Sequence, residues 1–125
     1  MKESTIYEQI SQYLQLQYPG VIYRFDSAAD MKMTIGQAAK NKRRNPHRGY
    51  PDLFIAEPHG DYHGLYIEIK KEGQDPYRKD GKLKSDEHIQ EQAEMLRKLS
   101  DKGYAATFAV GFEGVKEVID TYMHQ

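Results

Sequence analysis

Cysteine is absent from this sequence of 125 residues, which excludes disulfide bonds and zinc sites built on thiolates. Long apolar runs are absent as well, so we expect no membrane-spanning segment and no secretory signal sequence. The net charge of −1 does not by itself indicate a nucleic-acid partner. These features are compatible with the cytoplasm, and the length predicts one domain, residues 1–125, with a core of its own.

Positive charge is nevertheless concentrated in one short segment that contains no acid. Five basic residues fall within nine positions: Lys40, Lys42, Arg43, Arg44 and Arg48. Such a cluster can contact the phosphate groups of a nucleic acid, and a solvated basic loop is the alternative interpretation. Its place immediately before Asp52, which belongs to the strongest motif of the chain, favours the nucleic-acid interpretation.

Apolar periodicity and turn residues predict the element order αβ(α)ββαβα. Helices are expected over residues 3–17, from a cap at Ser85 to Gly103, and over 113–123, with a short one between 31 and 42. Strands are expected over 21–25, 52–56, 65–71 and 104–110, and the polar segment 72–84 is expected to be a mobile loop. A strand–helix–strand unit over 65–110 implies a parallel pair, so the predicted fold is a small mixed sheet flanked by helices, in the α/β class.

Two runs carry most of the functional information. They are Gly49-Tyr50-Pro51-Asp52-Leu53 and, sixteen residues after the aspartate, Glu68-Ile69-Lys70. Side chains two apart in a strand share a face, so Glu68 and Lys70 should project together and Ile69 the other way. A charged pair facing the inside of a small sheet is costly to desolvate unless ions or partners satisfy it, which indicates a site.

Acids and a lysine in this pattern are suited to phosphodiester hydrolysis. Asp52 and Glu68 supply hard oxygen ligands for Mg²⁺ or Mn²⁺, and the backbone carbonyl of Ile69 is a candidate third ligand. Lys70 would orient or help to deprotonate the attacking water and stabilise developing negative charge.

Two residues from other elements complete the candidate site. At about 100° per residue, Glu3 lies on the apolar stripe of its helix and could hold a metal-bound water or a second ion. Gln92 falls within the buried stripe of its own helix, which is unusual for an amide. It could hydrogen-bond Lys70, the nucleophilic water or a substrate phosphate.

Each candidate also has a purely structural interpretation. Asp52 could cap a strand, Gln92 could be a satisfied core amide, and Glu3 could favour the helix dipole. Glu68 and Lys70 could form a solvated ion pair worth about 0–1 kcal/mol. One site explains these residues together better than independent coincidences do.

Together these residues resemble the VRR-NUC family within the PD-(D/E)XK nuclease superfamily. The matching positions are Glu3-Ser4-Thr5-Ile6, the Gly49 and Glu68 motifs with Gly64 before the latter, and Gln92 followed by Leu96, Leu99, Gly103 and Tyr104. The resemblance covers essentially the whole chain and is to the compact, stand-alone form found in phages and bacteria. It implies a restriction-endonuclease-like fold and a Mg²⁺- or Mn²⁺-dependent endonuclease. In that enzyme Asp52 and Glu68 bind metal, Lys70 is catalytic, and Glu3 and Gln92 support the site.

The resemblance also implies a DNA partner. Stand-alone members resemble Holliday-junction resolvases and are expected to act as homodimers, and members fused to larger proteins act on flaps and crosslinked structures. No membrane and no organic cofactor are expected, and a phage-encoded protein would work in the host cytoplasm. Two alternatives stay open: a nuclease-like module that binds nucleic acid without turnover, and an RNA-binding domain that uses segment 40–48.

The sequence departs from the family pattern in two places. The valine–arginine–arginine signature is not evident, because Gly103-Tyr104-Ala105-Ala106-Thr107-Phe108 occupies the corresponding strand. The segment 72–84 is also longer than in compact members, and it could contact substrate, gate the site or simply be disordered.

Overall fold

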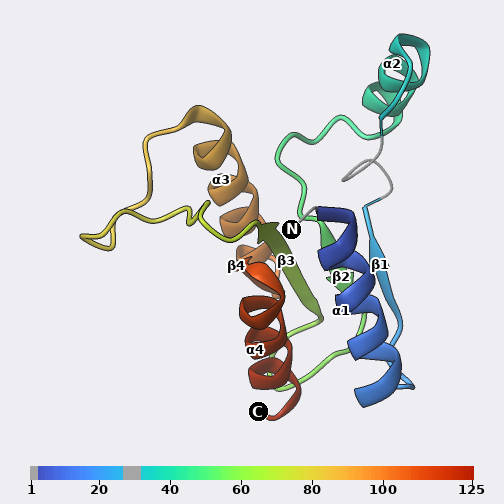
Figure 1. Cartoon of the computed structure of the whole chain (residues 1–125). Helices are drawn as coiled ribbons and strands as arrows, with labels where there is room; N and C mark the ends of the chain where they lie inside the picture. The colour runs from blue at the N-terminus through green and yellow to red at the C-terminus, as the bar shows by residue number, and fades with distance from the viewer. Residues whose placement is uncertain (1–2, 27–31) are drawn as a thin grey trace.

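The structure, a computed structural model, describes residues 3–26 and 32–125, with the side chains of Glu3 and Ser4 outside that description. Its elements are α1 (Glu3–Gln17), β1 (Tyr23–Phe25), α2 (Ile35–Arg44), β2 (Leu53–Ile55), β3 (Leu65–Lys70), α3 (Glu87–Asp101), β4 (Ala105–Val110) and α4 (Gly111–Met123) (Figure 1). This order is the predicted one, including the short helix before β2. No helix among the described residues has the length and apolarity needed to cross a membrane.

The four strands form one mixed sheet in the order β1-β2-β3-β4. β1 pairs antiparallel with β2, and β2 antiparallel with β3, which confirms the hairpin predicted over 52–71. β3 and β4 are parallel and α3 connects them, as the strand–helix–strand pattern indicated. The register aligns Arg24 with Phe54 and Phe54 with Tyr66, so these three side chains form one row across the sheet.

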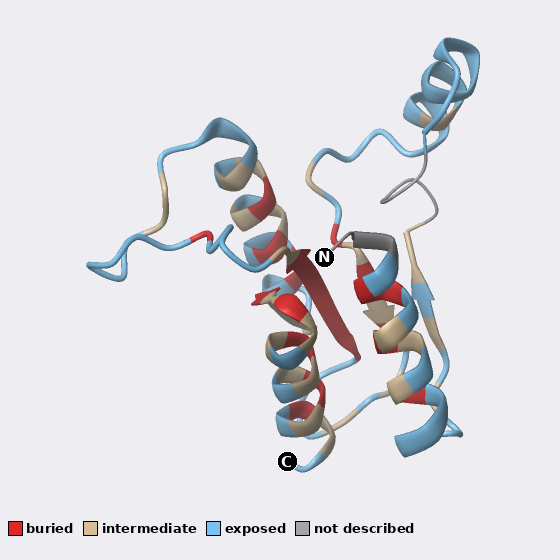
Figure 2. Cartoon of the chain, in the orientation of Figure 1, coloured by how far each residue is buried: buried red, intermediate tan, exposed pale blue. Residues whose placement is uncertain are grey.

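One face of the sheet makes the hydrophobic core with α1 and α4. Leu65, Ile67 and Ile69 alternate along β3 and are all buried in this core. Figure 1 shows α1 and α4 side by side over this face, and Figure 2 shows the buried positions of both helices turned toward the sheet. Leu14 of α1 and Ile119 of α4 are each at most 1% exposed. The alternation therefore leaves the even-numbered residues of β3 for the opposite face.

The opposite face is packed by α3 beside β4. Three α3 residues are buried, two leucines and Gln92, at helical spacing. Gly103 ends this helix region with φ of 99°, the left-handed conformation expected for a glycine after a helix.

Local details correct some predicted boundaries. The N-cap of α3 is Asp86, whose carboxylate accepts a hydrogen bond from the Ile89 N–H at 3.1 Å, so the cap predicted at Ser85 is wrong by one residue. The aspartate has the three-residue spacing to Ile89 that a cap requires. α4 begins at Gly111, two residues earlier than predicted. β1 and β2 each have only three residues, shorter than predicted.

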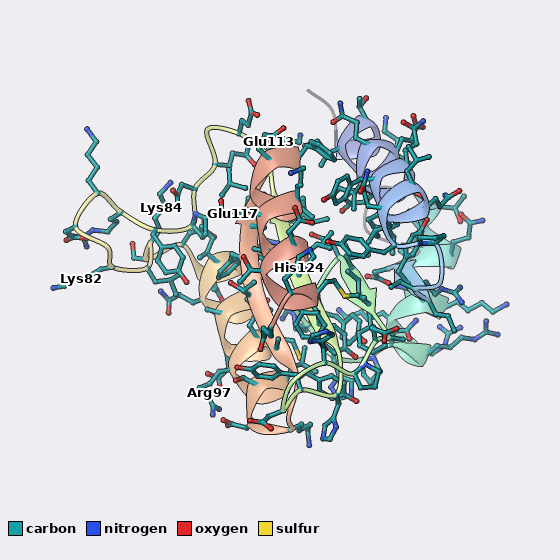
Figure 3. All side chains as sticks on the ribbon, turned by 90° about the horizontal axis from the view of Figure 1, so that it is seen from below. Lys82, Lys84, Arg97, Glu113, Glu117 and His124 are labelled. Atoms are coloured by element: carbon teal, nitrogen blue, oxygen red, sulfur yellow. The ribbon has the colours of Figure 1, made fainter. Side chains whose placement is uncertain are left out.

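Segment 72–84 contains no helix or regular strand, as predicted, but it does contain a local turn. Tyr77 and Leu83 form an isolated bridge, and the Arg78 N–H donates to the Lys82 carbonyl at 2.7 Å. Figure 3 shows Lys82 and Lys84 on this segment, far from the side of the molecule that carries α1.

Asp120 links α4 to the N-terminal part of the chain. Its carboxylate accepts hydrogen bonds from the hydroxyl groups of Tyr13, at 2.5 Å, and Tyr18, at 2.8 Å. The Lys116 ammonium approaches the same carboxylate at 3.4 Å. Burial alone would raise the pKa of Asp120, but these hydrogen bonds and the lysine charge outweigh it and lower the pKa.

Replacing Asp120 with asparagine should lower the free energy of unfolding by about 1–2 kcal/mol at neutral pH, because hydrogen bonds to a charged acceptor are weakened. A lowered folded pKa means that this stability is present above about pH 4 and is lost as pH falls through the folded pKa. Denaturant unfolding of both proteins between about pH 7 and pH 2 should show the difference shrinking toward low pH. Glu117→Gln, an exposed change on the same helix, is the control. A pH-independent difference would contradict the assignment.

Candidate active site

Asp52 lies just before β2 and bonds to the strands on both sides. Its carbonyl accepts a hydrogen bond from the Asp26 N–H at 2.8 Å, next to β1. Its carboxylate Oδ2 accepts one from the Ile69 N–H of β3, also at 2.8 Å. The Asp52 side chain thus accepts a hydrogen bond from a β3 amide that has no β2 residue to pair with. This contact fixes the position of the carboxylate.

The register brings three carboxylates into one row. β2 begins at Leu53, and one step beyond it the antiparallel pairing places Asp52 between Asp26 and Glu68. Directly opposed residues on neighbouring strands have Cβ atoms about 5 Å apart. The sixteen-residue spacing between Asp52 and Glu68 therefore places the two acids side by side across the hairpin.

Glu68 and Lys70 share the face opposite Ile69, as predicted. Glu68 is only 3% exposed and contacts neighbouring groups. The Lys70 Nζ donates a hydrogen bond to Gln92 Oε1 at 2.5 Å and lies 5.9 Å from the centre of the Phe108 ring. The solvated ion-pair interpretation does not fit a glutamate as buried as this one.

Gln92 connects the lysine to α3. It is 6% exposed, and its Nε2 lies 3.3 Å from the Nε2 of His88, one turn earlier in the helix. The hydrogen bond to Lys70, which was one of the roles expected for this amide, is therefore present. Because the amide oxygen is an acceptor, it holds the ammonium group in place without neutralising its charge.

Gly49 allows the motif containing Asp52 to pack against α3. Its φ is 72°, and an added Cβ would lie 2.9 Å from the Glu91 carbonyl oxygen and 3.1 Å from the Gln92 nitrogen. The glycine is needed for both its backbone conformation and this close approach. The contact sets the distance between the strand that carries the acids and the helix that carries Gln92.

A cleft of about 800 Å³ opens over β1 and β2, on the face that α3 leaves uncovered. Asp26, Asp52 and Glu68 lie along it with Gln92 and His88. Arg24, Tyr50 and Phe54 also belong to its lining, as do Arg44 and Asn45 at the end of α2. The cleft therefore contains acids, cations and aromatic rings.

The residues present have the chemistry that a divalent cation needs. Asp52 and Glu68 provide carboxylate oxygens, and in a strand the Ile69 carbonyl points to the same side as its N–H, which bonds to Asp52. Within residues 3–26 and 32–125, no group of three or more acidic or histidine side chains is close enough to form a metal site alone. Mg²⁺ commonly uses one or two carboxylates together with waters and substrate phosphates, so this oxygen set fits it.

Glu3 and the basic cluster are the other predicted site residues. Glu3 opens α1, but its side chain lies outside the described residues. The basic cluster occupies α2 and the chain after it, where all five side chains are exposed and only Arg44 lines the cleft. The exposed Arg48 lies 3.7 Å from the half-buried Glu91, and an ion pair this accessible to water contributes little.

The structure adds residues to which sequence reasoning gave no role. His88 precedes Gln92 by four positions, and this helical spacing was the available signal for their contact. Tyr50 precedes Asp52 by two positions, and both line the cleft. Arg24 and Phe54 gave no comparable signal, because their alignment depends on strand register.

The fold agrees with that of a solved structure. One described as a VRR_NUC domain protein is similar over 99% of this chain and 89% of its own length, with a TM-score of 0.72 and 27% sequence identity. No protein-family model and no curated protein matches the chain. The structural likeness confirms the predicted resemblance and the restriction-endonuclease-like α/β fold.

Gly49→Ala should lower the free energy of unfolding by about 2 kcal/mol or more, because a methyl group meets the α3 backbone and the positive φ is strained. Gly73→Ala is a matched control, since its φ is 86° but no atom lies within 4 Å of the added Cβ. Thermal and denaturant unfolding of the two variants isolate the packing contribution. Equal losses would show that Gly49 does not set the approach to α3.

Proposed function

We propose that this chain, which has the fold and motifs of a VRR-NUC nuclease-like domain, is a metal-dependent endonuclease that hydrolyses DNA phosphodiester bonds. The observation that carries the proposal is the buried Glu68 beside Asp52, with Lys70 held by Gln92 on the same face. A purely structural role does not account for two carboxylates that line an open cleft and a lysine bonded to Gln92 of the same lining.

Asp52 and Glu68, with the Ile69 carbonyl, would hold Mg²⁺ or Mn²⁺. When bound, the ion supplies Lewis-acid stabilisation of charge on the phosphate and favours ionisation of water. The Ile69 N–H holds Asp52, so one carboxylate oxygen is engaged by the protein and the group keeps its orientation. Glu3, from α1, is a candidate support for a water or a second ion.

Lys70 would act on the attacking water or on the scissile phosphate. Gln92 and the Phe108 ring limit where its ammonium group can lie. A positioned cation at this place stabilises the negative charge that develops as the phosphodiester is attacked. Gln92 has a positioning role, because it acts on the reaction through the lysine.

The preferred substrate in this proposal is branched DNA, such as a four-way junction or a flap. A homodimer would present two sites, which could cut two strands of a junction symmetrically. Light scattering of the protein alone and with junction DNA measures the stoichiometry. The exposed basic residues of α2 supply a surface for the DNA backbone near one end of the cleft.

Cleavage should depend on the metal and on Glu68 and Lys70. Purified protein is incubated with labelled junction, flap, duplex and single-stranded DNA in Mn²⁺ and then Mg²⁺. Glu68→Gln should abolish cutting, and Lys70→Ala should reduce kcat by about 100-fold, because a transition-state interaction is removed. Calorimetry should show divalent-metal binding that Asp52→Asn weakens.

Glu117→Gln and Lys98→Ala, both exposed and away from the cleft, are the matched controls and should cut normally. A loss of less than about tenfold in Lys70→Ala would contradict the role of the lysine. If no DNA is cut but binding is retained in the presence of metal, the protein is a binding module.

Basic residues of α2 should contribute to affinity for DNA of any sequence. Arg43→Ala should weaken binding and reduce the slope of log K against log salt by about 1, since one phosphate contact is lost. No residue of α2 is buried, so this variant should unfold like the parent chain. Lys98→Ala on α3 is the control, and fluorescence anisotropy over a salt series is the measurement. An unchanged slope would place the DNA elsewhere.

A further inference from the structure

The row of the sheet next to the acids carries a cation and two aromatic rings. Arg24 of β1 is aligned with Phe54 of β2, and Phe54 is aligned with Tyr66 of β3. The acids Asp52 and Glu68 lie two residues from Phe54 and Tyr66, on the same face, a distance of about 7 Å along a strand. The face that carries the candidate catalytic residues thus continues directly into an aromatic surface.

These rings form a fixed platform. Phe54 stacks on Tyr66 with ring centres 4.4 Å apart and an angle of 24° between the planes. Tyr50 stands edge-on against Tyr66, at 5.6 Å and 83°, and its hydroxyl donates a hydrogen bond to the Tyr66 oxygen at 3.0 Å. Burial, followed by the Tyr50 hydroxyl, raises the pKa of Tyr66, so the Tyr66 hydroxyl stays neutral at physiological pH.

The platform is accessible from the cleft. Tyr50 is 42% exposed, and Tyr50 and Phe54 both line the same cleft as Asp52. Because Tyr50 is held edge-on against Tyr66, part of its ring is left accessible in the cleft to a stacking partner. Arg24 and Arg44 in the same lining are cations suited to the phosphate of that ligand.

We propose that the Tyr50–Phe54 wall of the cleft binds an unpaired nucleotide of a DNA strand, stacking its base while Arg24 contacts its phosphate. This proposal deepens the proposed function, on which it rests, by naming the substrate feature that is recognised. In duplex DNA each base is stacked between its neighbours, so only a single-stranded, flapped or unpaired position presents a free base face. The protein therefore prefers DNA with an unpaired nucleotide next to the bond that is cut.

Binding without metal tests the proposal separately from cleavage. Fluorescence anisotropy in EDTA compares a single-stranded oligonucleotide with a blunt duplex of the same length. Tyr50→Ala should weaken single-strand binding by about tenfold and duplex binding by less than about twofold, because one base loses its stacking partner. Tyr50→Phe, which keeps the ring, should bind single strands within about twofold of the parent protein.

Further variants separate stacking from folding. Tyr62→Ala removes a tyrosine of similar exposure, 40%, that does not line this cleft, and it should leave both affinities unchanged. Phe54→Leu keeps an apolar side chain at a half-buried position and should show the same selective loss as Tyr50→Ala. Thermal unfolding establishes that each variant is folded. A 2-aminopurine base in the single strand should change fluorescence on binding the parent but not Tyr50→Ala.

The proposal is overturned if Tyr50→Ala weakens the binding of single strands and of duplex equally, or if it weakens the binding of neither. Because these measurements contain no metal, the outcome does not depend on turnover. A parent protein that cuts no DNA but shows the selective loss would overturn the nuclease and support the stacking wall. If the parent protein cuts DNA but Tyr50→Ala shows no selective loss of single-strand binding, the nuclease is supported and the stacking wall is overturned.

Discussion

The hydrogen bond from the Ile69 N–H to the Asp52 carboxylate is the contact on which the arrangement of the site depends. β3 is twice as long as β2, so its last amides extend beyond the end of its neighbour. A buried amide without an acceptor costs about 1–3 kcal/mol. Asp52 supplies that acceptor from its side chain, and the same contact holds its carboxylate beside Glu68. One hydrogen bond therefore both satisfies the Ile69 amide at the end of β3 and positions the carboxylate of the candidate metal ligand.

One face of the sheet packs in the core, and the other carries the candidate site. The odd-numbered residues of β3 are buried against α1 and α4 and belong to the core. The even-numbered residues lie on the face where α3 packs beside β4 and where the cleft opens over β1 and β2. Neighbouring residues of a strand point to opposite faces of the sheet. A polar substitution at Ile67 should therefore affect the stability of the core, and one at Glu68 the chemistry of the candidate site.

The sequence predicted the features that depend on local periodicity. The two-residue spacing of Glu68 and Lys70 put both on one face, and the helical stripe through Gln92 brought its amide to the lysine. Strand register was not predictable, because pairing between β1, β2 and β3 depends on contacts far apart in the chain. The Arg24 row and the proximity of Asp26 to Asp52 both follow from register. Asp86 replaced Ser85 as cap because adjacent residues offer equivalent oxygens, and only the backbone angle decides between them.

α2 is capped at both ends yet buries nothing: Thr34 and Gln37 form a capping box, and Ile35 is 93% exposed. Its shape is set by local hydrogen bonds and not by packing. Because α2 buries no residue, selection to keep the core packed places little constraint on the surface of α2. The charge, length and reach of this helix can diverge among descendants of the chain while the sheet and its acids stay intact, so a new surface beside the cleft can arise without a new fold.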